Sequence, residues 1–543
     1  MKFSGQKIIK IGQMLLVALA LNVVSSCRED VLTEQPLSFL SPDITLVNKA
    51  GFESAITALH AGNRELMLAA DDWDTWWTLF LGTDIGTINA QIGARTRDVE
   101  ATLTPVYTGV NWHWNWAYLT MLPRANQIIE YANRPTATWS NDAEKNAILA
   151  EARFFRGYVY NHLANIFGGV PIVDKVFTTP KLDFARSTRQ EVLQFAKADL
   201  EFASQGLPLT EPQPGRITKD AADHLLTEVY ISLAEYDKAI ATATSVIGSG
   251  RNKLMTTRFG RFRDRPGDPY SDLFKDSNQN RSSGNTESLW VMQIEFQTPG
   301  GTAGGNNGNN WIRCWGPRYF EIRDPENRPG MVLADSIGRP VAWMRPSNHI
   351  IHGIWRDDPN DMRNSSFNMR RTMTYNNTTS KFFGQRVQPH PFLDTLNSFY
   401  PYPRKIEGLT LAGVTAGRTF MDIALYRLAE TYLLRAEAHL LKGDRVKAAE
   451  DINVVRGRAN AKPVLPAQVD IDYILDERLR ELLVEEPRRK TLYRTGKLQE
   501  RVLKYNGNPL TTSTFKPKHV LFPIPQAFID ANNGNRIEQN PGY

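Results

Sequence analysis

The sequence predicts a mostly α-helical protein in which pairs of helices stack into a right-handed superhelical frame, with a loop-rich insert that contains a few short strands. Three observations support this fold class. The same helix–turn–helix pattern occurs twice, the helical signal fades between about residues 250 and 418, and the chain has 543 residues. This length exceeds the size at which one hydrophobic core usually stops growing, so stacked repeats or several cores are expected.

Helical periodicity begins soon after the N-terminal segment. Phe52, Ile56 and Leu59 recur at helical spacing, and a longer apolar stripe runs through residues 143–167. Two glycines at 168–169 end that stripe, as expected at a helix C-terminus. The first part of the chain is therefore predicted to be helical.

Two later segments, 218–247 and 423–459, each contain a helical pair with a similar turn. The first turn runs from Ala234 to Ala239 and the second from Lys442 to Ala448. Both turns resemble the G-x-Y-x-K-A turn of tetratricopeptide repeats, and residues 143–206 form a more degenerate candidate pair.

Each pair also carries a small residue twelve positions before the Ala of its second helix. These residues are Thr227 before Ala239 and Ala436 before Ala448. Small side chains are needed where two helices cross closely, so the pattern favours true repeats. Unrelated helical hairpins remain the alternative.

The insert between about Gly250 and Arg418 is rich in Gly, Asn and Pro and contains short alternating runs such as residues 290–296. This composition predicts loops with a few strands. A loop-rich insert on a rigid helical frame is where a binding site is expected. The Pro-rich end, residues 520–543, is apolar enough to pack against the body.

The N-terminus resembles a lipoprotein signal peptide. Basic residues up to Lys10 precede an apolar run to Val24, and Ser25 and Ser26 lead to Cys27. The run is too short for a typical spanning helix, and the small residues before Cys27 resemble a lipobox, which predicts acylation of Cys27 and a lipid anchor. A signal peptide that happens to end near a cysteine is the alternative.

The predicted organisation has five parts. In chain order they are a signal peptide (1–26), a lipidated tether (27–48), an N-terminal helical region with repeat pairs (49–249), the insert that forms part of the ligand face (250–418), and C-terminal helical pairs with the Pro-rich end (419–543). Because only Cys27 and Cys314 are present, acylation of the first leaves no pair for a disulfide.

Charge excludes one class of partner. The net charge is +6, and removal of the signal peptide with its three lysines leaves +3. This charge is too small for a chain of this size to indicate nucleic-acid binding, and the basic residues are spread among the acidic ones.

Several segments behind Cys27 occur in an order that is jointly specific. They are Arg124-Ala125-Asn126, Glu151-Ala152-Arg153-Phe154-Phe155-Arg156 followed by residues 167–172, then residues 285–290, 432–438, 453–459, 477–482 and 539–543. Together they resemble the SusD/RagB family of outer-membrane nutrient-binding lipoproteins. One departure is the loss of an Asp between Glu485 and Arg494, which removes the usual carboxylate partner of Arg494.

The resemblance implies a function. It implies binding of a nutrient glycan at the cell surface and delivery to a TonB-dependent outer-membrane transporter, a SusC-like β-barrel, for which the protein acts as an extracellular lid. It implies no catalysis, no metal and no cofactor. Oligopeptide capture for the same kind of transporter is the alternative.

The resemblance also implies a shallow ligand site made by N-terminal loops and the insert. Sugar rings stack their C–H faces on aromatic rings, and their hydroxyl groups need planar polar partners. The candidate stacking rings are Trp76, Trp114, Trp311 and Trp315, and the candidate hydrogen-bonding partners are Asp84 and Arg95. Helical spacing places Trp112 and Trp116 toward the core and Trp114 on the opposite, more exposed face.

Two other function classes remain open. Asp71, Asp72 and Asp74 could supply the carboxylates of a glycosidase, but the sequence contains no motif of a nucleophile, zinc protease or phosphate-binding loop. Helical repeats also serve as protein-interaction scaffolds, which bind peptides on their concave face.

Overall fold

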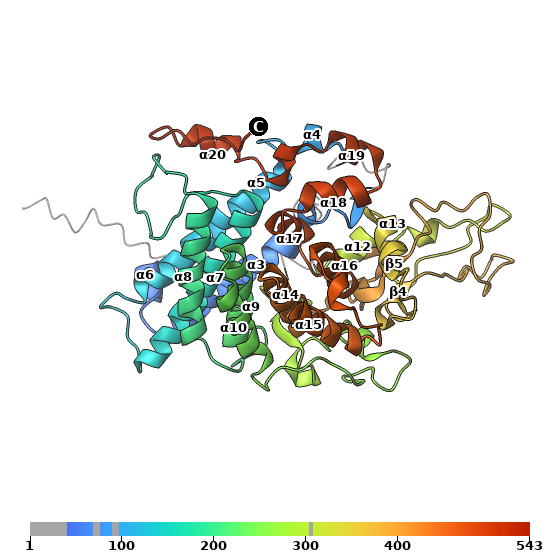
Figure 1. The fold of residues 1–543 in the computed structure, drawn as a ribbon, viewed down its shortest axis with the longest axis horizontal. Coiled ribbons are helices and arrows are strands. Elements are labelled where there is room, and N and C mark those ends of the chain that lie inside the picture. Colours follow the sequence, from blue (N-terminus) through green and yellow to red (C-terminus); the bar gives the residue numbers. More distant parts are fainter. Residues whose placement is uncertain (1–40, 69–75, 89–96, 303–307) are drawn as a thin grey trace, which may run out of the picture.

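The structure is a computed structural model that describes residues 41–68, 76–88, 97–302 and 308–543. Helices of the first half, blue to green in Figure 1, pack side by side next to the brown and red C-terminal helices. The yellow and orange segments of the insert lie on the other side of the C-terminal helices and extend as a lobe. The predicted mostly helical fold with few short strands is confirmed.

The N-terminal helices surround the long helix α7. Their bounds are α2 (Pro42–Thr45), α3 (Lys49–Leu68), the 3-10 helix η2 (Trp76–Leu79), α4 (Val99–Thr102), α5 (Thr108–Asn115), the π-helix η4 (Trp116–Met121), α6 (Leu122–Tyr131), α7 (Asp142–Ile166) and α8 (Arg189–Gly206). The side chain of Asn141 caps α7 by accepting a hydrogen bond from the backbone N–H of Glu144, and Gly168 follows its C-terminus with a φ of 77°.

The last residues of the predicted tether differ from the prediction. Residues 42–45 form α2 rather than extended chain. The backbone N–H of Thr138 donates to the carbonyl of Val47, and Asp43 pairs with Arg134 at 2.8 Å. These contacts hold the segment against residues 134–138, which follow α6.

The two predicted repeat pairs are present and stack together. They consist of α9 (Lys219–Ser232) with α10 (Tyr236–Ile247), and of α14 (Leu428–Leu441) with α15 (Arg445–Arg458). Helix α8 packs on α9, and α10 packs on α14. The stack is therefore continuous from α7 to α15, although the insert separates the pairs in sequence.

The small residues at the helix crossings have the predicted role. Thr227, Ala239, Ala436 and Ala448 are all completely buried. The turn residues also correspond, because Ala234 and Gly443 both have a positive φ, of 59° and 85°. A left-handed residue ends the first helix of each pair in the same way.

Among the described residues, three two-stranded antiparallel sheets brace the insert. They are β1 (Gly86–Ile88) with β3 (Met344–Pro346), β2 (Ser288–Met292) with β6 (Ile423–Arg427), and β4 (Met369–Arg370) with β5 (Tyr402–Pro403). The prediction that a helix begins at Ile423 is wrong by five residues, because residues 423–427 pair with β2 before α14 begins.

Short helices complete the insert and the C-terminal part. In the insert they are α11 (Pro269–Asp272), η5 (Arg281–Ser283), α12 (Trp311–Trp315), η6 (Tyr319–Glu321), α13 (Asn348–Ile351), η7 (Gly353–Trp355), η8 (Met362–Asn364), η9 (Arg404–Ile406) and η10 (Val414–Ala416). After the second repeat pair they are η11 (Pro466–Gln468), α16 (Ile471–Leu482), α17 (Arg488–Arg494), α18 (Leu498–Tyr505), α19 (Pro509–Thr514), η12 (Pro517–Val520) and α20 (Gln526–Ala531).

Arg494 has a carboxylate partner despite the departure in sequence. Its Nη2 atom lies 2.8 Å from Oε2 of Glu437 on α14, and both side chains are buried. A carboxylate from another helix thus replaces the Asp that the local sequence lacks.

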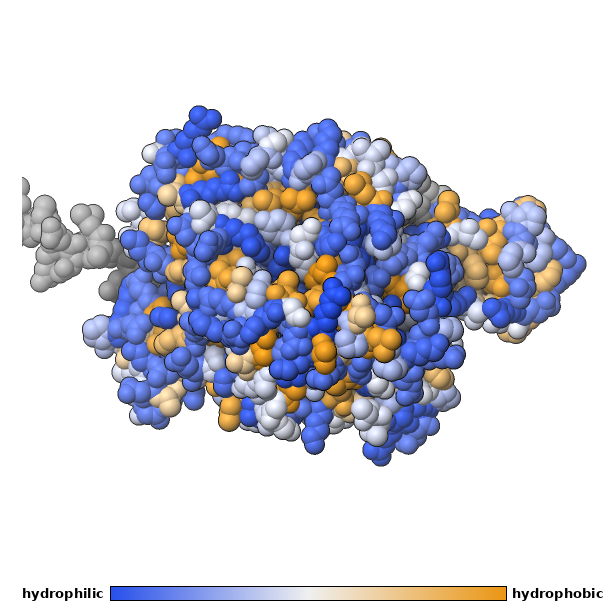
Figure 2. Space-filling view, in the orientation of Figure 1, coloured by the Kyte–Doolittle hydropathy of each residue, from blue (hydrophilic) through white to orange (hydrophobic). Residues whose placement is uncertain are grey.

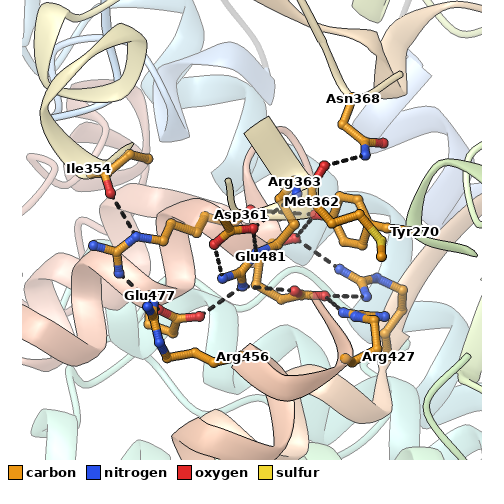
Figure 3. Close-up of polar contacts among 12 residues, drawn as sticks. Tyr270, Ile354, Asp361, Met362, Arg363, Asn368, Arg427, Arg456, Glu477 and Glu481 are labelled. Carbon is orange, nitrogen blue, oxygen red and sulfur yellow. Dashed lines mark hydrogen bonds and ion pairs between the residues drawn. The ribbon is translucent and has the colours of Figure 1, made fainter. Parts of the chain in front are cut away.

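A buried network of charges joins the insert to α16 (Figure 3). Arg363 of the insert lies 2.6 Å from Asp361, 2.8 Å from Glu477 and 3.2 Å from Glu481, and its side chain is completely buried. Arg427, at the end of β6, lies 2.9 Å from Glu481. Removal of one partner would leave an unpaired buried charge, so the network fixes the position of the insert on α16.

The surface in Figure 2 is mostly hydrophilic, with hydrophobic residues in patches between the helices and on the lobe. Exposed apolar residues of the insert include Phe383 and Phe392. Within the described ranges, no helix combines the length and the apolar character that crossing a membrane requires.

Candidate binding cavity

Three of the predicted ligand-stacking rings are buried. Trp76 is 2% exposed, Trp311 4% and Trp315 0%. Trp76 and Trp315 both contact Phe80, with ring centroids 5.8 and 6.5 Å away, and Trp77 lies 5.4 Å from the same ring. We call Trp76, Trp77, Phe80 and Trp315 the Phe80 ring cluster.

The predicted stacking role of these three tryptophans is therefore corrected to core packing. Protein atoms cover their ring faces, so a sugar from solvent has no free face on which to stack. Trp76 and Trp315 share the neighbour Phe80, and the residues that cover them come from segments far apart in the chain.

Asp84 is also corrected. Its carboxylate accepts hydrogen bonds from Nε and Nη2 of Arg488, at 2.9 and 2.7 Å, and from Nε of Arg501 at 2.7 Å. Burial alone would raise the pKa of Asp84, but the two guanidinium groups lower it below its ordinary value. The carboxylate ties its turn to α17 and α18 and is not available to a ligand. Arg95 lies outside the described residues, so its role stays a prediction.

Trp114 lies at an open cavity, although it is only 3% exposed. The prediction of an exposed ring is wrong because Phe167 and Phe528 pack against it, at centroid distances of 5.2 and 4.8 Å. Trp116 is buried as predicted, and its Nε1 atom donates to the carbonyl of Gly62. Trp112 is half-buried.

The cavity beside Trp114, which we call the α5–α20 cavity, has a volume of about 580 Å³. Its walls are α5, the π-helix η4, the start of α6, residues 171–184 between α7 and α8, and α20. Figure 1 shows the loop between α7 and α8 beneath α20. This volume lies within the range of roughly 300–1,000 Å³ that is typical of small-molecule sites.

Five aromatic rings form a continuous wall of this cavity. Trp114 and Tyr118 are 4.6 Å apart, and Tyr118 is nearly parallel to Phe528, at 6.2 Å and 19°. Phe184 lies 6.1 Å from Phe528, and Phe177 lies 5.9 Å from Phe184. Phe177 is 38% exposed, so the wall extends to the surface.

Polar side chains lie among these rings. Asn111, Asn115 and Gln127 line the cavity and supply amide donors and acceptors, and Arg124 and Lys175 supply positive charge. The combination of ring faces with planar polar groups is the chemistry that a sugar requires.

Residues of the family-like motifs hold the 171–184 wall in place. Asn126 donates from Nδ2 to the carbonyl of Val173 at 2.8 Å, and its Oδ1 accepts from Nη1 of Arg156 at 2.8 Å. Arg156 also binds Asp199 through two bonds of 2.7 and 2.8 Å, and the backbone N–H of Val173 donates to the Tyr160 hydroxyl. The motif residues thus build the cavity wall as well as the core.

The C-terminal segment is bonded to the end of the same 171–184 wall. Asn532 accepts a hydrogen bond from the backbone N–H of Phe184 and donates to its carbonyl, at 2.7 and 2.9 Å. The backbone N–H of Gly534 donates to the carbonyl of Leu182. Residues at the end of the chain therefore complete a site that begins near residue 111.

Tyr118 occupies the π-helix, a local irregularity that often occurs at functional sites. Its hydroxyl donates to the carbonyl of Pro171 at 2.6 Å. Burial raises the pKa of Tyr118 well above its ordinary value, so the hydroxyl stays protonated. Its ring is positioned by this bond and presents an uncharged face.

No group of three or more His, Cys, Asp or Glu side chains is placed to bind a metal ion within the part of the chain that the structure describes. Cys314 is buried in the core, and burial raises the pKa of its thiol well above the ordinary value. It is therefore an unreactive thiol in this fold.

Comparison with known families decides the identity of the fold. Residues 338–543 match the family model described as the SusD family, and residues 42–231 match the model described as starch-binding associating with outer membrane. The chain belongs to the SusD/RagB family.

Curated relatives of this SusD/RagB family member match over most of their length. SusD-like protein P2 of Formosa agariphila is 24% identical and covers 94% of this chain and 96% of its own. Starch-binding protein SusD of Bacteroides thetaiotaomicron is 25% identical and covers 81% of each chain.

Solved structures confirm the fold. A laminarin binding SusD-like protein superimposes with a TM-score of 0.68 at 22% identity, covering 91% of this chain and all of its own. Surface glycan-binding protein A from Bacteroides thetaiotaomicron has a TM-score of 0.68 at 20% identity, covering 92% of this chain and all of its own. The tetratricopeptide-like helical frame is thus shared with these proteins.

Sequence reasoning missed most of the cavity. It identified Trp114, but not Tyr118, Phe177, Phe184 or Phe528. Arg124 was recognised only as part of the Arg-Ala-Asn motif. The signals present were the apolar Pro-rich end and the aromatic residues after residues 167–172, but nothing in the sequence showed that these segments meet.

Proposed function

We propose that the protein binds a nutrient glycan at the cell surface and that the α5–α20 cavity is its ligand site. The observation that carries this proposal is the wall of five rings, interleaved with amide side chains, around an open volume of about 580 Å³. Apolar faces of sugar rings would stack on Tyr118, Phe177 and Phe528, and sugar hydroxyl groups would bond with Asn111, Asn115 and Gln127.

The names of relatives support a glycan ligand. Starch, laminarin and surface glycans appear in the names of proteins that share this fold. We infer a binding role without catalysis, because the cavity is lined by no carboxylate among the described residues and glycosidases need a pair of them. Hydrolysis of a bound glycan would contradict this inference.

The location and partner are further parts of the proposal. Acylation of Cys27 would hold the protein on the outer membrane, facing the exterior. The bound glycan would pass to a TonB-dependent β-barrel transporter, which the protein would cover as a lid. The motif at Cys27 and the family membership support this arrangement. Isolation from detergent-solubilised membranes without a β-barrel partner would contradict it.

The glycan site is tested by titration calorimetry of the purified mature protein against polysaccharides and, in parallel, oligopeptides. We expect Phe528→Ala to weaken glycan binding by more than roughly tenfold, because it removes a stacking ring. The matched control is Phe392→Ala, which removes an exposed ring of the insert. Equal affinity of both variants would exclude this cavity, and binding of peptides but no polysaccharide would overturn the glycan proposal.

A further inference from the structure

The α5–α20 cavity has an unbalanced charge. Among its described lining residues, Arg124 and Lys175 are charged, and no Asp or Glu is present. Two cations beside a shared ring wall produce a positive potential that a neutral ligand would not use.

Two acidic groups near the cavity, Glu130 and Asp183, are engaged with other partners. Oε1 of Glu130 lies 2.7 Å from Arg134, and its Oε2 accepts from the backbone N–H of Val176. Asp183 pairs with Lys181 at 2.6 Å. These carboxylates compensate other groups, so the charge of the lining cations is not neutralised by them.

The two lining cations lack such partners. In the described ranges of the chain neither Arg124 nor Lys175 forms an ion pair within 4 Å. Arg124 uses one amino group to donate to the carbonyl of Ala58 at 3.0 Å, and Lys175 lies with its Nζ 5.5 Å from the centre of the Phe177 ring. Both retain donors for a ligand.

From this charge and geometry we infer that the cavity selects an anionic saccharide. The apolar face of its sugar ring stacks on the aromatic wall, and its carboxylate or sulfate ester pairs with Arg124 and Lys175. This inference rests on the proposed glycan function and specifies the ligand class. Guanidinium and ammonium groups bind both kinds of anion, and the aromatic wall requires that the anion be attached to a ring.

A matched pair of ligands tests the inference. Calorimetry would compare an oligogalacturonide with its methyl ester, and a sulfated galactan oligosaccharide with its desulfated form, after a screen on an array of neutral and anionic glycans. We expect the anionic member of one pair to bind at least about tenfold more tightly, and this difference to shrink in 0.5 M NaCl because salt screens exposed charges.

Variants then assign the effect to the cavity. Lys175→Gln and Arg124→Gln should each weaken anionic binding by roughly three- to tenfold and neutral binding by a clearly smaller factor, because each removes one charge contact. The matched control is Lys381→Gln, at an exposed lysine of the insert that pairs with Glu326. Equal or tighter binding of the neutral ligands would overturn the inference and leave the proposed function standing. Binding of no glycan on the array would overturn the proposed function itself.

Discussion

The Phe80 ring cluster and the α5–α20 cavity are both rich in aromatic side chains, yet only one of them is open to a ligand. In the first, Trp76 and Trp315 pack around Phe80 with 2% or less of each tryptophan exposed. In the second, rings of similar spacing surround about 580 Å³ of open space. The number of aromatic residues is thus a poor guide to a sugar site, and the space beside the rings is the better one.

The strongest test of this difference is Trp315→Ala. The substitution empties a fully buried position, so we expect a loss of about 3–5 kcal/mol in the free energy of unfolding, measured by chemical denaturation. Glycan affinity of the folded fraction should stay unchanged, with Phe392→Ala as a control that alters neither quantity. A variant of normal stability that no longer binds glycan would restore Trp315 to the ligand site.

The contrast also shows what the sequence could predict. The helical pairs could be predicted because the signals are local: Thr227 and Ala239 lie twelve positions apart on two consecutive helices, and both are buried where these cross. The cavity could not be predicted because its halves are distant in sequence. The backbone of Phe184 forms two hydrogen bonds with the side chain of Asn532, and no sequence periodicity indicates that contact.

The roles predicted for charged residues were wrong for the same reason, because their partners are distant in sequence. Asp84 follows aromatic residues in a turn, which fits a ligand contact, but its partners Arg488 and Arg501 lie more than 400 positions later. A buried carboxylate and an exposed one are indistinguishable until the fold places the opposite charges. The missing partner of Arg494 was supplied in the same way by Glu437.

Acid should weaken a third region, the buried charge network that joins the insert to α16. Glu477, in the network that joins the insert to α16, is fully buried, which alone would raise its pKa, but Arg363, Arg480 and Arg456 lower the pKa to about 2. The folded protein therefore binds this proton less tightly than the unfolded chain does. The stabilisation, about 3 kcal/mol for this group, is complete above about pH 4.5 and is lost as the pH falls toward 2.

Urea denaturation between pH 7 and pH 2 measures this dependence. Glu477→Gln should already be destabilised at pH 7 and should lose less stability than the wild type below pH 4.5. Glu326→Gln, at an exposed ion pair of the insert, is the control and should follow the wild-type curve. If Glu477→Gln and the wild type lose stability in parallel, other carboxylates control the acid transition.

The smallest expected effect on stability comes from the wall of the cavity itself. Asn126→Ala removes the bonds to Val173 and Arg156, which should cost about 1–3 kcal/mol because buried polar groups are left unpaired. Tyr160 still binds Val173 and Asp199 still binds Arg156, so the protein should fold. The 171–184 wall should lose its fixed position, and glycan affinity should fall by roughly tenfold, or about 1.4 kcal/mol. Asn133→Ala, at an exposed amide that bonds to the carbonyl of Ile129, is the matched control and should change neither stability nor affinity. Because Trp315→Ala is expected to reduce stability alone and Asn126→Ala to reduce affinity as well, the opposite pattern would mean that the buried cluster, and not the open cavity, contacts the ligand.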